Sequence, residues 1–308
     1  MDHMEYDISI VSNEDVSDIV SLFLTSDPRH SRSTLYYSYS NNFPHASSLC
    51  AVAKNHDGRI VGHYSILLLK FKRLNKIYNV GYAQQAIVHK KYRNLKLISE
   101  LHNFAIERVK DRLDFVFAFS NDNFLKIKTK IFGWSDLGSF FSDVVDLRMI
   151  NFEVDHKIES LQKFENGFTP NENKLSIIKT EDYLNHRLLE NPVEHYKTFI
   201  IKENDITIGY ISLKFYKRDD EVVGHFIDFE AKNIEILMSL VAKSKEYFSF
   251  YGVHKVIFWN RTEYQQLFNP YIVEKGFSTN LIVKNFSNNK EILNKDLWSL
   301  PMILSDAF

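Results

Sequence analysis

Apolar and polar positions follow two different periods along this chain. Tyr6–Val11 alternates as a strand does, and the next segment has apolar residues at helical spacing, with Ser12 or Asn13 placed to cap the helix. The helical stripe consists of Val16, Ile19, Val20 and Phe23. Residues 25–48 are rich in Ser, Asn, His and Tyr, and they predict a long loop that is functional or mobile. We therefore expect an α+β fold built on a mixed sheet.

The same series of signals returns about 140 residues later. A turn leads into a strand at Gly62 and again at Gly209, and Gly81 opens an apolar run as Gly224 does. In each half an amphipathic helix and a short apolar strand follow, and then an asparagine, Asn121 or Asn260. Any two α/β domains would share hairpins, helices and strands, so this alternative stays open.

A polar stretch near residues 151–175 lies between the two series and has the composition of a connection. We predict two copies of one unit, residues 1–150 and 151–308, each a mostly antiparallel sheet flanked by helices.

Composition narrows the class of protein. The chain has 308 residues, a formal charge of −1 and nearly equal numbers of basic and acidic residues, 38 and 39, which argues against bulk attraction to nucleic acid or anionic membrane. Its one cysteine excludes an intrachain disulfide or a cysteine-rich zinc site. We found no metal-ligand motif, signal peptide or apolar run long enough to span a membrane. A cytoplasmic protein without a metal is expected.

Charge is unevenly distributed. The 42 residues from Gly58 to Ser99 contain no Asp or Glu but nine Lys or Arg. The densest part, His89–Lys96, lies between a predicted strand and the first turn of a predicted helix, where main-chain amides and the helix dipole favour an anion. The segment predicts a polyphosphate site; the alternative is a basic face on an otherwise neutral protein.

At these residues the sequence resembles the GNAT acyltransferase superfamily, whose strand-to-helix loop wraps the pyrophosphate of coenzyme A. The run Arg93–Ile98 keeps the arginine, but Lys96 and Ile98 stand where the family has glycines, and Ile98 is expected to crowd the phosphates. Thr129 stands where the family often has a tyrosine that protonates the thiolate. The resemblance implies acyl-CoA as co-substrate, contacted by Ile87, Val88, Arg93, Asn94, Leu95, Lys96, Leu97, Ile98, Asn121 and Phe124.

The duplication resembles bacterial two-domain N-acyltransferases that act on nucleotide-linked amino sugars, such as dTDP-3-amino-3,6-dideoxyhexoses, for surface polysaccharides. This resemblance implies transfer of an acyl group to a sugar amine by a monomer with pseudo-dimeric domains. In the second half, Asp228 and Glu230 replace the basic loop and would repel a pyrophosphate. We therefore expect a degenerate second domain that contributes to the acceptor site and does not bind CoA.

The proton acceptor is less well defined by the sequence. Gln85, His63 and Asp228 are the candidate catalytic residues, and the candidate substrate-binding residues are Gln84, Tyr82, His225 and Trp259. His225 and Asp228, three positions apart on a strand, are expected to face opposite sides. Each candidate has a structural alternative: a satisfied histidine, a buried hydrogen bond for Asp228, or aromatic core packing for Trp259.

Two other functions remain open. Tandem GNAT folds also occur in tRNA-dependent aminoacyl transferases, although a charge of −1 does not favour a tRNA surface. A non-catalytic, ligand-binding GNAT-like protein would explain the missing glycines and the missing general acid.

Overall fold

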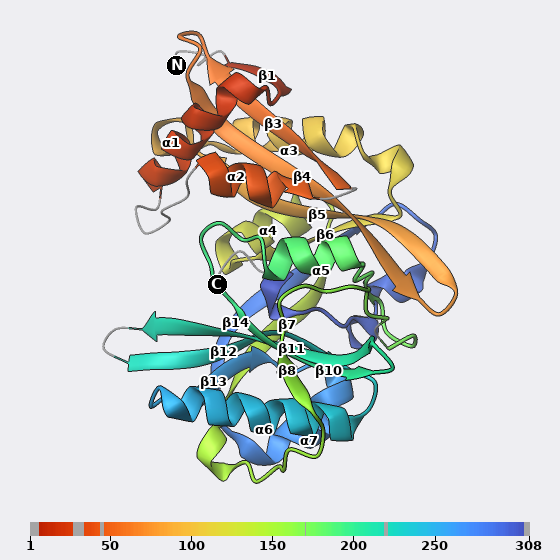
Figure 1. Cartoon of the computed structure of the whole chain (residues 1–308). Helices are drawn as coiled ribbons and strands as arrows, with labels where there is room; N and C mark the ends of the chain where they lie inside the picture. The colour runs from red at the N-terminus through yellow and green to blue at the C-terminus, as the bar shows by residue number, and fades with distance from the viewer. Residues whose placement is uncertain (1–5, 27–33, 44–45, 170, 219–220, 305–308) are drawn as a thin grey trace. The chain divides into compact units, whose positions relative to one another are not determined.

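The computed structural model (Figure 1) describes the whole chain except residues 1–5, 27–33, 44–45, 170, 219–220 and 305–308. The contacts divide the chain into two compact units. Unit 1 comprises Met1–Phe71, Ile77–Leu137 and Leu281–Leu293, and unit 2 comprises Lys72–Lys76, Gly138–Asn280 and Asn294–Phe308. Each unit therefore takes segments from both halves of the chain.

Unit 1 is built on a mostly antiparallel sheet whose strand order is β1-β3-β4-β5-β6, followed by the end of β14. Its strands and helices are β1 (Tyr6–Ile10), α1 (Val16–Ser26), α2 (Thr34–Asn41), β2 (Asn42–Phe43), β3 (Ala46–Asn55), β4 (Ile60–Arg73), β5 (Lys76–Val88), α3 (Leu95–Glu107), β6 (Phe115–Ser120) and α4 (Asp122–Lys130). The pairing of β1 with β3 and of β3 with β4 is antiparallel, whereas β5 and β6 run parallel.

Unit 2 repeats this order as β8-β10-β11-β12-β13-β7, with most of β14 beside β7. Its elements are β7 (Ser135–Asp146), β8 (Ile158–Ser160), β9 (Ser176–Ile177), α5 (Glu181–Leu188), β10 (Lys197–Glu203), β11 (Ile206–Arg218), β12 (Glu221–Ala231), α6 (Ile234–Phe250), β13 (Lys255–Trp259), α7 (Gln265–Phe268) and β14 (Ile272–Asn285). Helix α6 packs on β10, β11 and β12 (Figure 1).

Two pairs of glycines mark equivalent points of the units. A Cβ on Gly62 would lie 2.7 Å from Leu101 of α3, and one on Gly209 would lie 2.4 Å from Ile236 of α6, so each glycine lets its helix approach the sheet. Gly81 and Gly224 meet the next parallel strand in the same way, 2.8 Å from Val116 and 2.9 Å from Val256. The predicted fold class is confirmed, and both units share one order of elements.

The last strand of each copy lies partly in the other unit. Strand β7 follows α4 of unit 1 but pairs with β13 of unit 2 from Ser142 to Asp146. Strand β14 follows α7 of unit 2, and its residues Leu281–Asn285 belong to unit 1. The limits of the two units therefore do not fall at residue 150, where the predicted copies meet.

The segment predicted as a loop at residues 25–48 contains α2, so that prediction is wrong there. Tyr37 and Tyr39 are both buried, so tyrosine rings supply much of the apolar face of α2. The predicted cap is present, because the Ser12 amide donates to Asp15 at 2.8 Å ahead of α1. In the part of the chain that the structure describes, none of the helices is long and apolar enough to cross a membrane.

A lysine is buried in unit 1 among aromatic rings. Lys128 of α4 is 2% exposed; its Nζ lies 2.5 Å from the Tyr64 hydroxyl and 3.9 Å from the centre of the Trp134 ring. Burial and the nearby Lys284 hold the pKa of Lys128 well below its usual value. Next to it, Trp134 donates to Nε2 of His102, and burial lowers the pKa of this histidine to about 3. Burial thus disfavours the charged form of both side chains in this part of the core.

Candidate active site

The candidate site of unit 1 lies where β5 separates from β6. The parallel pairing of the two strands covers only Val80–Tyr82 against Phe115–Phe117, although β5 continues to Val88 and β6 to Ser120. Beyond Tyr82, the main chain of β5 on this side is therefore not used by β6. A strand edge of this kind can pair with an extended ligand.

The main chain of β5 has an unusual conformation at Gln85, three residues beyond Tyr82, its last residue paired with β6. Gln85 has a φ of 53°, in the left-handed region that is unfavourable for residues other than glycine, and such a conformation costs about 1–3 kcal/mol. Its side chain is held by α2: Gln85 Nε2 donates to Ser40 Oγ at 3.0 Å, and Asn41 Nδ2 donates to Gln85 Oε1 at 3.0 Å. The neighbouring Gln84 donates to the Ser40 carbonyl at 3.2 Å. The end of α2 and the residues Gln84 and Gln85 of β5 thus form one buried polar cluster.

His63 of β4 binds the main chain of Gln85. Its Nδ1 lies 2.8 Å from the Gln85 carbonyl oxygen, and its Nε2 lies 2.9 Å from the Tyr37 hydroxyl. The imidazole is fully buried. The structure therefore brings together two of the predicted catalytic residues, Gln85 and His63, and adds Tyr37.

The predicted phosphate loop lies between the end of β5 and α3. Arg93, Asn94 and Lys96 are exposed, and the Asn94 side chain caps α3 by accepting from the Leu97 amide at 2.8 Å. The Leu97 amide is thus used by the cap; amides at a helix start have no partner within the helix, and the positive end of the helix dipole lies at this loop. The side chains of Leu97 and Ile98 are buried in the core of unit 1. The expectation that Ile98 crowds the phosphates is therefore wrong, because its side chain faces the sheet.

The second predicted cofactor element is also formed. Asn121 follows β6 and caps α4 by accepting from the Phe124 amide at 2.9 Å. Phe124 is partly buried against the core of unit 1. Thr129 donates to the Leu125 carbonyl at 2.8 Å, so its hydroxyl is used inside the helix.

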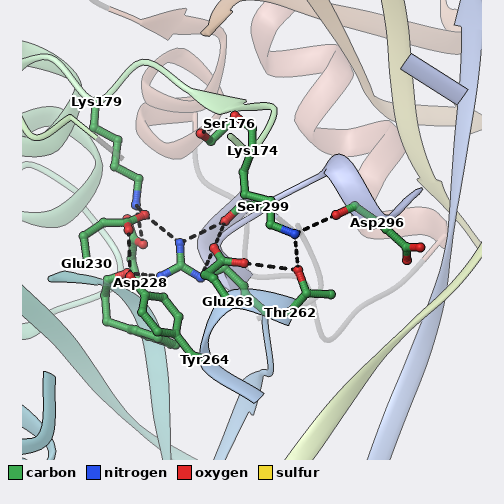
Figure 2. A network of polar contacts seen from close by, with 12 residues as sticks. Lys174, Ser176, Lys179, Asp228, Glu230, Thr262, Glu263, Tyr264, Asp296 and Ser299 are labelled. Carbon is green, nitrogen blue, oxygen red and sulfur yellow. Dashed lines mark hydrogen bonds and ion pairs between the residues drawn. The ribbon is translucent and has the colours of Figure 1, made fainter. Parts of the chain in front are cut away.

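Asp228, the third predicted catalytic residue, lies in unit 2 within a buried ion network. Lys179 Nζ is 2.6 Å from Asp228 Oδ1 and 2.9 Å from Glu230 Oε1 (Figure 2). Arg261 Nη1 is 2.6 Å from the same Glu230 oxygen. Both cations lower the pKa of Glu230, and the carboxylates in turn raise the pKa of Arg261. The Tyr210 hydroxyl donates to Asp228 at 2.8 Å. The carboxylates are therefore neutralised inside the unit.

Arg261 also donates to the strand edge of unit 2 that corresponds to Ala86–Val88 of unit 1. Strands β12 and β13 pair only at Gly224–Val256 and His225–Ile257, so β12 separates from β13 as β5 separates from β6. Arg261 Nη2 donates to the main-chain oxygen of Phe229, five residues after Gly224. The residue five positions after Gly81 is Ala86, which is exposed. An arginine thus reaches this strand edge in both units, because in unit 1 Arg93 Nη2 donates to the Val88 main-chain oxygen at 3.4 Å.

The surroundings of the first turn of α6 also differ from the prediction that Asp228 and Glu230 would repel a phosphate there. A hollow of about 240 Å³ there is lined by three lysines, and Asp228 and Glu230 are not among its lining residues. The lysines and their carboxylate partners are Lys157–Glu159, Lys202–Glu165 and Lys232–Glu203. Carboxylate repulsion from Asp228 and Glu230 is therefore not what distinguishes this end of unit 2.

The predicted substrate residues are mostly buried. Tyr82 stacks on Phe117 with ring centres 4.9 Å apart, and Trp259 packs 5.8 Å from Phe140. His225 is 2% exposed, and burial lowers its pKa to about 4. The register of β12 shifts between Phe226 and Asp228, so that Phe226 and Phe229 share one core and His225 lies on the same face as Asp228. The expectation of opposite faces is wrong, because the bulge adds one residue between them.

Within the described residues, no group of three or more His, Cys, Asp or Glu side chains is placed to hold a metal ion. The sequence analysis missed Tyr37, Ser40 and Asn41 because they were assigned to a loop. It also missed Lys179 and Arg261, whose partners are about 30 to 50 residues away in the chain. The only local signal was a pair of carboxylates, Asp228 and Glu230, in an apolar strand.

Comparison with known proteins agrees with this geometry. Residues 16–127 match the acetyltransferase (GNAT) family. This segment contains Gln85, the basic loop and α3. The resemblance to the GNAT superfamily is confirmed for it. No curated protein sequence matches the chain.

Solved structures extend the likeness to almost the whole chain. A GCN5-related N-acetyltransferase from Anabaena variabilis has a TM-score of 0.69 at 11% identity, and a probable N-acyltransferase of Enterococcus faecalis has 0.68 at 8%; for both, 92% of this chain and 73% of the other are covered. N-myristoyltransferase of Saccharomyces cerevisiae with bound myristoyl-CoA has 0.61 at 10% identity, covering 91% of this chain and 79% of the other. At these identities the likeness defines the fold. The family match over residues 16–127 is what points to the acetyltransferase (GNAT) family.

Proposed function

We propose that this protein transfers an acyl group from acyl-CoA to the amine of a nucleotide-linked amino sugar, and that unit 1 holds the donor. The observation that carries the donor site is the divergence of β5 from β6 directly before a basic helix start. The edge Ala86–Val88, which β6 does not use, can pair with the amides of the pantetheine arm once Arg93, whose Nη2 lies 3.4 Å from the Val88 oxygen, turns to the phosphates. The first turn of α3 offers main-chain amides, Arg93 and Lys96 to the phosphates.

Unit 2 enters the proposal as a copy that binds no CoA. Arg261 already donates to the strand edge there, and the lysines around the first turn of α6 are paired with glutamates. Asp228 is satisfied by Lys179 and Tyr210, so we assign it a structural role. The sugar acceptor rests on the resemblance to two-domain sugar acyltransferases and on the duplicated fold.

The test combines binding and turnover. Thermal unfolding is followed with CoA and acetyl-CoA, and thiol release from acetyl-CoA is followed with a panel of dTDP-linked amino sugars. Ligand at about 100 times its Kd adds about 2.7 kcal/mol to the stability of the folded state, which raises the Tm by several degrees for a protein of this size. A rise with CoA and thiol release with one sugar are expected. The absence of any CoA effect would overturn the donor site, and binding with release by other amines would overturn only the acceptor.

A further inference from the structure

His63 is a fully buried histidine whose two ring nitrogens both have partners, and this arrangement settles its tautomer. A carbonyl oxygen only accepts, so Nδ1, 2.8 Å from the Gln85 oxygen, carries the proton and donates it. In the neutral ring Nε2 then has the lone pair and accepts from the Tyr37 hydroxyl at 2.9 Å. Burial raises the pKa of Tyr37, which keeps this hydroxyl protonated as a donor.

The surroundings of the ring favour the neutral form. The rings of Phe23 and Tyr37 lie edge-on to the imidazole, each with its centre 5.5 Å away. A general base must present a free lone pair to its substrate. The lone pair of His63 faces Tyr37, and the side chain has no exposed surface.

The hydrogen bond from His63 to Gln85 lies directly before the strand edge that is proposed to bind the donor. Gln85 adopts its unfavourable conformation one residue before Ala86–Val88, the edge proposed to hold the acyl donor. Ser40 and Asn41 hold the Gln85 side chain, and His63 is the contact that holds its carbonyl. Rotation of this peptide would move the strand edge that follows it.

From this geometry we infer that His63 and Tyr37 form a positioning pair, which fixes the main chain of Gln85 so that the donor edge of β5 is aligned for acyl transfer. His63 therefore acts through the main chain of Gln85 and does not take up the proton of the acceptor. This inference rests on the proposed function for its catalytic consequence, and on the hydrogen bonds for its structural part.

The test compares His63→Asn with His63→Ala. The Asn amide nitrogen takes the place of Nδ1 and can donate to the Gln85 carbonyl, but it has no basic lone pair. We expect His63→Ala to lower kcat for acetyl-CoA by about 10- to 100-fold, as for a small misplacement of reacting groups, with little change in the Kd for CoA. His63→Asn is expected to recover most of kcat and to keep the pH profile of the wild type. His102→Asn, which alters another buried histidine of unit 1, is the matched control.

Equal loss of kcat in both His63 variants, with the acidic limb of the pH profile removed, would make His63 a base and overturn the inference. Wild-type kcat in a folded His63→Ala variant would overturn it as well. Turnover is measured as thiol release from acetyl-CoA, with the sugar acceptor and with water alone.

A second readout needs no substrate. Nitrogen-15 NMR of labelled histidine is expected to show His63 as the Nδ1–H tautomer at pH 7, unchanged by CoA, and to show a perturbed Nε2 signal in Tyr37→Phe. An Nε2–H tautomer or an imidazolium would overturn the inference. If the wild type neither binds CoA nor releases thiol, the proposed function fails, and the catalytic role of the pair fails with it. The NMR result then still decides whether His63 and Tyr37 form the inferred hydrogen bond.

Discussion

Gln85 of unit 1 and Asp228 of unit 2 both lie four residues after a glycine of the repeat, Gly81 or Gly224, and both mark an irregular point: Gln85 has a positive φ, and the register of β12 shifts just before Asp228. Neutral groups surround Gln85, whereas Asp228 is bound by Lys179 and Tyr210. Beyond Gln85 the exposed Arg93 reaches the Val88 oxygen, whereas beyond Asp228 the buried Arg261 donates to the Phe229 oxygen. The two copies thus share the position of the irregularity but differ in its conformation and in the charges around it.

The basic loop is expected to bind the phosphates of CoA. Arg93→Ala should weaken CoA binding by about 1–3 kcal/mol, the range of a lost charge-assisted hydrogen bond. Isothermal titration calorimetry measures this change. Lys70→Ala, which removes an exposed cation of β4, serves as the control and should leave the Kd unchanged. Equal effects of both variants would indicate a non-specific charge effect.

One molecule of CoA should bind per chain, because Arg261 at the strand edge of unit 2 is buried and bound to Glu230, whereas Arg93 at the edge of unit 1 is exposed. Lys96→Glu in α3 and Lys232→Glu beside α6 make a matched pair, since each reverses a charge near a helix start. The first should lower CoA affinity by about tenfold or more, and the second should not change it. A calorimetric stoichiometry of two, or a loss of affinity in Lys232→Glu, would contradict this difference between the units.

The ion network should be essential for the stability of unit 2. Lys179→Met leaves Asp228 without its cation and Glu230 with Arg261 alone, and breaking a buried pair in this way costs about 3–5 kcal/mol. Urea unfolding followed by circular dichroism measures the loss. Lys157→Met, which removes an exposed ion pair, should give the wild-type unfolding curve. A Lys179→Met curve identical to that of the wild type would refute the assignment.

Lys128 should make stability depend on pH. Its folded pKa lies below the ordinary value of 10.5, so between these two pKa values the unfolded state binds more protons and stability rises with pH. Lys128→Met should therefore stabilise the protein at pH 7 and flatten this dependence. His102, with a pKa lowered to about 3, adds a separate loss of stability as the pH falls from 6.5 toward 3. Denaturant midpoints for both proteins at several pH values test this, and parallel curves would show that Lys128 is charged in the fold.

The sequence predicted the elements that depend on local signals. Turn glycines, helix caps and apolar periods predicted the repeated hairpin, helix and strand, and the carboxylate-free run located the loop before α3. The period-two assumption failed at Asp228, because an added bulge residue restores one face to His225 and Asp228. Lys128 and Arg261 could not be placed from the sequence, because the groups that surround them come from distant segments.

Because each unit contains a strand segment from the other copy, unit 1 cannot be completed until most of the chain has been synthesised. The residues proposed to bind the donor are complete when Lys130 has been made, but unit 1 also contains Leu281–Leu293, which a ribosome reaches some 150 residues later. Until then the nascent unit lacks the strand that follows β6 in its sheet, and exposed strand edges of this kind favour aggregation. A premature stop before residue 281 would therefore disable a site whose proposed residues are all present.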